Sequence, residues 1–162
     1  MTDPPPIELR GFTSQDIGFV TQLATDERVV RFVGSGQPWS AGYISERADA
    51  ALAEDPLDRV GSCRWFIATR RGEPVGLLVA ARRTGSVEIG YWVAPASWGQ
   101  GVAGSILAQA VGLASGIFGC SVLSARVMPG NEASIRLLQR NGFQPQPADT
   151  DIVRFLLDTT RH

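Results

Sequence analysis

The sequence contains no lysine, and its single histidine is its last residue, His162. All 15 basic residues are therefore arginines. The absence of lysine excludes a phosphate-binding loop that ends in Gly-Lys, and it excludes catalysis through a lysine Schiff base. Without an internal imidazole, these residues cannot form a Ser-His-Asp triad, a Cys-His pair or a histidine zinc site.

Cysteine, net charge and long apolar runs are also scarce. Cys63 and Cys120 lack the spacing of metal ligands or of a disulfide framework, and their apolar surroundings predict buried thiols. A formal net charge of -1 gives no electrostatic basis for binding nucleic acid or an anionic membrane. The sequence has no run of about 18 apolar residues and no signal-peptide pattern. We therefore expect a cytoplasmic protein with no metal, no nucleic-acid partner and no membrane partner.

The residues that are present predict one mixed α/β domain over residues 1–162, with residues 1–6 as a flexible tail. Closely spaced strands between residues 63 and 93 favour antiparallel hairpins. Periodicity and capping residues predict strands at 7–10, 63–69, 74–81, 86–93, 121–128 and 152–157, and helices that begin at Ser14 and span 40–53, 101–117 and 131–140.

The most informative segment is residues 88–104, which read EIGYWVAPASWGQGVAG. A strand enters a glycine-rich turn, and the turn opens a helix. Glycines let main-chain N–H groups approach a ligand closely, and a helix start adds unpaired N–H donors and the positive end of the helix dipole. The segment therefore predicts a pyrophosphate site that needs no basic side chain.

One interpretation of this loop is a dinucleotide site in an oxidoreductase, because Gly99, Gly101 and Gly104 spell G-x-G-x-x-G. Its context fits poorly, since residues 95–98 separate the first glycine from the strand. The next strand, at 121–128, also ends without the acidic residue that would hold a ribose.

A second interpretation comes from a family resemblance. The residues WGQGVA at 98–103 resemble the Q/R-x-x-G-x-G/A signature of the GNAT acyltransferase superfamily, with Trp98 in place of the usual Gln or Arg. EIGYWV at 88–93 and NEASIRLLQRNGF at 131–143 are similar to the branch that contains ribosomal-protein N-terminal (alanine) acetyltransferases. The start, LRGF at 9–12, also matches. The resemblance runs from about residue 7 to residue 157.

This resemblance implies a GNAT-like domain with a central, mostly antiparallel sheet that is splayed between its fourth and fifth strands. It implies that acetyl-CoA is the cosubstrate and that a primary amine attacks it directly through a tetrahedral intermediate. The pantetheine arm would pair with the main chain near 91–93, and the pyrophosphate would contact N–H groups from 98 to 103. The residues predicted to bind the cosubstrate are Tyr91, Trp92, Val93, Trp98, Gly99, Gln100, Gly101, Val102, Ala103, Gly104 and Asn131.

Two residues are candidates for the chemistry. Glu88 is the only acid in the strands beside the expected notch, so it is the candidate base that deprotonates the amine, although a structural carboxylate is the alternative. Ser134 is the candidate partner of the leaving thiolate, because the helix at 131–141 has no tyrosine. A serine in the first turn of a helix that only assists capping is the alternative.

The acceptor is less defined than the donor. The resemblance implies a protein N-terminus or a small amine, and it also implies a homodimer. Trp39, Trp65 and Trp92 are candidates to line the acceptor site. Further acceptor contacts are expected from residues 31–43, from the loop before Trp65 and from residues 144–151, where Asp149 and Asp151 could attract a cation. A module that binds acyl-CoA without turnover remains an alternative from a different functional class.

Overall fold

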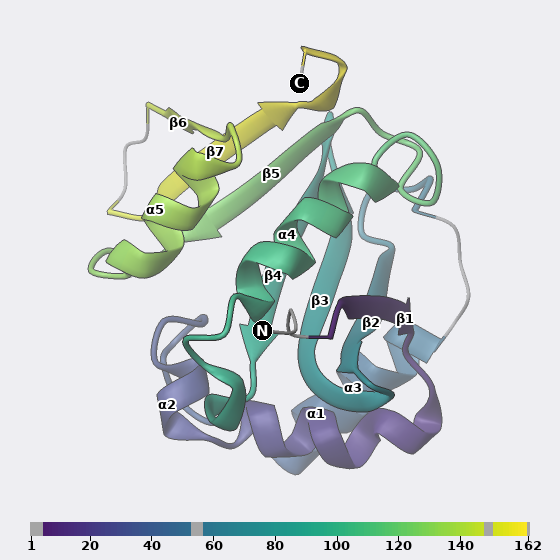
Figure 1. Ribbon diagram of the computed structural model, residues 1–162. Coiled ribbons are helices and arrows are strands. Elements are labelled where there is room, and N and C mark those ends of the chain that lie inside the picture. The colour runs from purple at the N-terminus through teal and green to yellow at the C-terminus, as the bar shows by residue number, and fades with distance from the viewer. Residues whose placement is uncertain (1–4, 53–56, 148–150, 162) are drawn as a thin grey trace.

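The computed structural model describes residues 5–52, 57–147 and 151–161 (Figure 1). Its centre is a seven-stranded sheet in the order β1-β2-β3-β4-β5-β7-β6. All neighbouring strands are antiparallel except β4 and β5, which are parallel. This arrangement confirms the predicted mixed α/β fold. The strands are β1 (Ile7–Gly11), β2 (Cys63–Arg70), β3 (Glu73–Arg83), β4 (Ser86–Val93), β5 (Val122–Val127), β6 (Gln144–Gln146) and β7 (Val153–Asp158).

Helices cover both faces of this sheet, and two apolar clusters form beneath them. Side chains alternate along β2, so that Phe66 and Ala68 join the cluster under α4, whereas Trp65 and Ile67 join the cluster with α1 and α3. Figure 1 shows α4 crossing in front of β4 and α5 lying over β5 and β7. The helices are α1 (Ile17–Ala24), α2 (Glu27–Val30), α3 (Ala41–Leu52), α4 (Val102–Leu113) and α5 (Glu132–Arg140), with short 3-10 turns η1 (Ser14–Asp16), η2 (Pro95–Ser97) and η3 (Thr159–Arg161).

The packing of α4 on the sheet depends on a glycine in β3. A Cβ at Gly76 would lie 2.8 Å from the Trp92 carbonyl oxygen and 3.0 Å from Ile106 Cδ1. Such a short approach to main chain is not tolerated, so only glycine lets β3, β4 and α4 come together here. This close packing holds the end of β4 directly beside the start of α4.

The strands β4 and β5 separate soon after they begin. They pair only at Val87 with Leu123 and at Glu88 with Ser124. On its other edge, β4 stays paired with β3 as far as Val93. Figure 1 shows the two strands diverging toward their carboxyl ends. Residues 89–93 therefore have a free edge toward β5, which confirms the predicted splay between the fourth and fifth strands.

Two predicted helices need correction, and the end of a third is not described. The helix expected at 101–117 ends at Leu113, because the chain turns to place Phe118 in the core against Phe66, with ring centroids 6.1 Å apart. The helix expected to begin at Ser14 is preceded by the short turn η1, which Thr13 caps. The helix expected to reach residue 53 is described to Leu52, and residue 53 lies outside the described residues.

Two short elements were not predicted. The strand β6 contains Pro145, which lacks a main-chain N–H, but β6 lies at the edge of the sheet and pairs only with β7. The single turn α2 is capped by Asp26, which accepts a hydrogen bond from the Arg28 N–H. Neither element has enough residues for a periodic pattern to emerge.

The described helices include none with the length and apolar character required to cross a lipid bilayer.

Candidate active site

The glycine-rich loop between β4 and α4 presents main-chain N–H groups without obstruction. Gly99 and Gly101 have φ values of 75° and 79°, in the left-handed region that favours glycine. A Cβ added at either position would meet no atom within 4 Å. The first hydrogen bond of α4 runs from the Ser105 N–H to the Gly101 carbonyl, at 3.1 Å. The N–H groups that precede Ser105 therefore have no acceptor inside the helix, and they form a cradle suited to an anion.

Trp98, which occupies the Gln or Arg position of the Q/R-x-x-G-x-G/A pattern, stabilises this loop through two hydrogen bonds. Its indole N–H donates to the Val93 carbonyl at 2.8 Å, and its ring stays 48% exposed. Its main-chain N–H donates to the Pro95 carbonyl at 3.1 Å. The N–H of Trp98 is thus already used inside the turn, so the open donors of the predicted set begin at Gly99.

Three further residues of the predicted cosubstrate set, Val102, Gly104 and Asn131, lie at the starts of α4 and α5. Val102 is buried in the core, and Gly104 lets α4 approach α5, because a Cβ there would lie 3.6 Å from Leu137 Cδ1. Asn131 caps α5, as predicted, by accepting a hydrogen bond from the Ser134 N–H at 3.3 Å. These contacts align the start of α5 with the start of α4 on the same side of the sheet.

A direct contact crosses the notch. The hydroxyl oxygens of Tyr91 on β4 and Ser134 on α5 are 2.6 Å apart. Burial raises the pKa of the Tyr91 phenol, and the hydrogen bond to Ser134 offsets this only in part. The phenol is therefore protonated at neutral pH and can donate to Ser134 Oγ. The sequence interpretation treated Tyr91 only as a main-chain contact and did not connect the two side chains.

Glu88 lies at the last pair of β4 and β5, and two arginines hold it. Arg126 Nε is 2.8 Å from Glu88 Oε1, and Arg83 Nη2 is 3.1 Å from Oε2. The Glu88 side chain is 18% exposed. Glu88 therefore lies beside the notch, as the sequence predicts, but both of its carboxylate oxygens form ion pairs with arginines. Sequence reasoning placed the carboxylate and missed both partners.

The three tryptophans expected at the acceptor site separate into two groups. Trp92 and Trp39 pack edge to face with ring centroids 5.0 Å apart, and Trp39 packs in the same way on Tyr43 at 4.7 Å. Tyr43 is 44% exposed, so this row of rings runs from β4 to the surface. Trp65 instead packs on Phe12, at 5.1 Å, inside the core.

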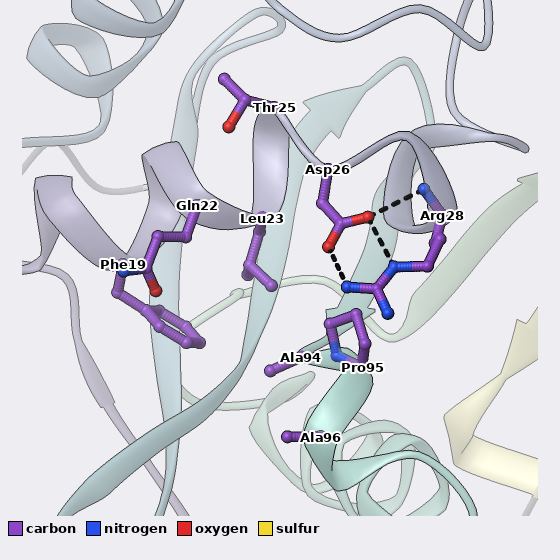
Figure 2. A pocket seen from close by; sticks show the side chains of 9 residues that line it. All are labelled: Phe19, Gln22, Leu23, Thr25, Asp26, Arg28, Ala94, Pro95 and Ala96. Carbon is purple, nitrogen blue, oxygen red and sulfur yellow. Dashed lines mark hydrogen bonds and ion pairs between the residues drawn. The ribbon is translucent and has the colours of Figure 1, made fainter.

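A surface hollow of about 530 Å³ lies on the α1 and α2 side of this region (Figure 2). Residues 94–96, which link the end of β4 to the glycine-rich loop, form one wall of this hollow. At its rim, Arg28 forms an ion pair with Asp26 at 2.7 Å and lowers the pKa of that carboxyl. The lining residues are Phe19, Gln22, Leu23, Thr25, Asp26, Arg28, Ala94, Pro95 and Ala96.

The sequence interpretation had assigned acceptor contacts to 31–43, to the loop before Trp65 and to 144–151. It did not include α1, because the helix reads as an ordinary amphipathic helix. Asp151 is exposed, and Asp149 lies outside the described residues. Within the described residues, no three His, Cys, Asp or Glu side chains gather into a group that could hold a metal ion.

The sequence matches a family of known proteins over most of its length. Residues 7–144 match the family model described as an acetyltransferase (GNAT) domain. The chain belongs to the GNAT acetyltransferase family. This membership confirms the predicted acetyltransferase class and replaces the oxidoreductase interpretation, for which the mostly antiparallel sheet is also unsuited.

Individual relatives agree with this GNAT assignment. An uncharacterized N-acetyltransferase, YoaA of Bacillus subtilis (strain 168), is 28% identical over 144 residues, which cover 85% of this chain and 79% of the relative. Spermidine N-acetyltransferase from Vibrio cholerae, solved with CoA and spermine, has a TM-score of 0.81 at 16% identity, covering 95% of this chain and 96% of that chain. RimJ from Mycobacterium smegmatis, solved with CoA-disulfide, has a TM-score of 0.80 at 21% identity, covering 98% and 86%. The two structures show that the fold is shared.

Proposed function

We propose that this GNAT protein transfers an acetyl group from acetyl-CoA to a primary amine. The observation that carries the proposal is the free edge of β4, which leads directly into a loop of open N–H groups at the start of α4. The first feature suits a pantetheine arm, and the second suits a pyrophosphate. The similar fold of the Vibrio cholerae enzyme, whose structure holds CoA and spermine, supports this assignment.

The proposed donor site uses main chain more than side chains. Pantetheine amides pair with the free edge at Tyr91–Val93, and a main-chain N–H near Val93 stabilises the oxyanion of the tetrahedral intermediate. The pyrophosphate rests on N–H groups from Gly99 to Ala103. Val102, Gly104 and Asn131 hold the walls of the site by packing and capping.

The proposed chemistry needs no covalent intermediate. The neutral amine attacks the thioester carbonyl, and the tetrahedral intermediate collapses to release the acetylated amine and the CoA thiolate. The Ser134 hydroxyl donates a hydrogen bond to that sulfur. In this proposal Tyr91 donates to Ser134 Oγ, which leaves the serine hydrogen free to point toward the sulfur.

Glu88 is the proposed acceptor of the proton that the amine loses, directly or through a water. Its two ion pairs hold the carboxylate at the base of the notch, and Glu88 must release one arginine contact to receive the proton. The Glu88→Gln variant should keep its affinity for acetyl-CoA and lose at least tenfold in kcat. A loss of folding stability and of acetyl-CoA affinity alongside the slower rate would instead assign Glu88 a structural role.

The acceptor is proposed to approach from the α1–α3 face, where the hollow and the row of aromatic rings lie. The sequence resemblance favours a protein N-terminus, in the branch of ribosomal-protein alanine acetyltransferases. A small polyamine is the other candidate, supported by the spermine in the Vibrio cholerae structure. Phe19→Ala should raise the KM of the true acceptor without changing the affinity for acetyl-CoA, because Phe19 lies on α1, where it lines the hollow and packs on the cluster under α1 and α3.

The deciding experiment is calorimetric titration with acetyl-CoA, with NADH in a parallel titration. Binding of acetyl-CoA alone supports the donor site, and absence of acetyl-CoA binding refutes the proposal. Release of the CoA thiol is then followed with a peptide that has a free N-terminal alanine, with spermidine and with an aminoglycoside. Tight acetyl-CoA binding without turnover on any amine would favour a non-catalytic acyl-CoA module.

A further inference from the structure

The glycine-rich loop contains no charged residue, yet it has to hold a pyrophosphate group. Residues 94–104 include neither arginine nor an acid, and the chain has no lysine anywhere. Main-chain N–H groups and a helix dipole supply only partial positive charge. A formal cation near this loop must therefore come from another part of the chain.

Arg70, the last residue of β2, reaches this loop. Its Nη1 donates a hydrogen bond to Oε1 of Gln100, 30 residues further along the chain. The amide nitrogen of Gln100 in turn donates to the Ala96 carbonyl at 3.3 Å. The Gln100 side chain thus links the guanidinium to both ends of the turn that precedes α4.

Among the residues that the structure describes, the charge of Arg70 has no counterion. Within the described residues, no carboxylate forms an ion pair with it, and its Nε is buried without a hydrogen-bond partner. Glu73 stands directly opposite Arg70 in the β2–β3 register, but it is exposed and makes no such pair. By contrast, Arg10 and Arg126 both hold carboxylates.

A partly buried guanidinium without an anion is unfavourable, because it has given up water and gained no opposite charge. An anion bound on the neighbouring loop would compensate that loss, and guanidinium groups suit phosphate well. The open N–H groups of the loop and the guanidinium of Arg70 would therefore both be stabilised by a bound phosphate group.

We propose that Arg70 supplies the positive charge of the pyrophosphate site, and that Gln100 holds this charge against the loop. This inference rests on the proposed function, since it concerns the same donor site. Arg70 recognises the nucleotide part of acetyl-CoA, so it affects the affinity of the phosphate-bearing ligand and leaves the thioester arm alone.

The test compares acetyl-CoA with S-acetylpantetheine, which carries the same thioester arm without phosphates. Arg70→Gln should weaken acetyl-CoA binding about tenfold and flatten the dependence of the dissociation constant on salt. Arg70→Lys, which keeps the charge, should lose less. The weak affinity for S-acetylpantetheine, measured by ligand-observed NMR, should be the same for Arg70→Gln and for the wild type.

Arg71→Gln is the matched control. Arg71 is the exposed neighbour of Arg70 in the β2–β3 turn, so its substitution changes the net charge equally at nearly the same place. Equal losses for Arg70→Gln and Arg71→Gln, or equal losses for the two ligands, would overturn the inference. Circular dichroism confirms that each variant is folded.

The two proposals can fail separately. A wild-type protein that does not bind acetyl-CoA refutes the proposed function, whereas wild-type binding that survives Arg70→Gln refutes only the role of Arg70. Inorganic pyrophosphate provides a probe that is independent of the acetyl group. Competition by pyrophosphate in the wild type and its loss in Arg70→Gln supports the anion site, and equal competition in both proteins contradicts it.

Discussion

At the scale of single residues, the hydroxyl pair across the notch is the feature that most directly links structure to chemistry. Tyr91 and Ser134 are 2.6 Å apart, although 43 residues separate them in the sequence. Although α5 contains no tyrosine, the phenol of Tyr91, on the other side of the notch, contacts Ser134 of that helix. Ser134 also gives its main-chain N–H to Asn131, so the start of α5 holds both of its polar groups in place.

Removing either hydroxyl should slow the reaction without weakening donor binding. We expect Ser134→Ala and Tyr91→Phe each to lower kcat about tenfold, because one hydrogen bond to a charged leaving group is worth about 1.5 kcal/mol. The double variant should be no slower than Ser134→Ala, since Tyr91 acts through the serine. Thr160→Ala is the control, because it also removes one hydroxyl, which donates to Asp158 Oδ1 in the exposed turn after β7. Additive losses in kcat would show that the two hydroxyls act independently.

At the scale of elements, the junction of β1 and α1 depends on a buried carboxylate. Asp16 is 5% exposed and accepts hydrogen bonds from Arg10 Nη2 at 2.8 Å and from the Thr13 N–H at 2.9 Å. The bond from Arg10 is the main reason why the pKa of Asp16 is lowered. Arg10 is 44% exposed, so water screens part of this interaction.

Asp16→Asn should lower the free energy of unfolding by about 2 kcal/mol at neutral pH. Because the folded pKa of Asp16 lies below the unfolded value of about 3.9, its contribution is present above that value. The contribution is lost as the pH falls through the folded pKa. Urea unfolding at a series of pH values should therefore show the gap between wild type and variant closing toward low pH. A gap that stays constant would assign the loss to packing.

The loop before α4 is the second element whose behaviour can be tested. Gly101→Ala places a Cβ at a φ of 79°, which costs about 1 to 2 kcal/mol and should displace the neighbouring N–H groups of the loop. Thermal unfolding should show a modest loss, whereas acetyl-CoA affinity should fall at least tenfold. Gly112→Ala, on the exposed part of α4, should gain about 0.5 to 1 kcal/mol and bind normally. Similar affinities for the two variants would argue against the cradle.

At the scale of the whole molecule, the splay of the sheet determines which main-chain amides a bound ligand should protect from hydrogen exchange. Acetyl-CoA should slow amide hydrogen exchange at residues 89–93 and 99–103, because these are the unpaired edge and the open loop. The edge strand Gln144–Gln146 should exchange at the same rate with and without ligand, and it serves as the internal control. Protection confined to the hollow beside α1 would mean that the cosubstrate binds elsewhere.

Local features of this chain could be predicted from the sequence, because they depend on neighbouring residues. The close spacing of the strands between residues 63 and 93 indicated antiparallel hairpins, and β2, β3 and β4 are antiparallel. The glycine-rich loop was expected to present main-chain N–H groups, and Gly99 and Gly101 have the positive φ that only glycine readily adopts. The cap at Asn131 was predicted on the same local grounds. The position of the cradle at the start of α4 and the family resemblance followed from these residues alone.

Contacts between distant segments were decided only by the tertiary structure. Arg70 reaches Gln100 because the turn after β2 lies at the same end of the sheet as the loop after β4. Tyr91 meets Ser134 because β4 and β5 diverge and α5 lies against the gap. Glu88 is paired because β5 brings Arg126 beside it. No local pattern encodes these distances, since each depends on strand order and on the angle between strands that separate after two residue pairs.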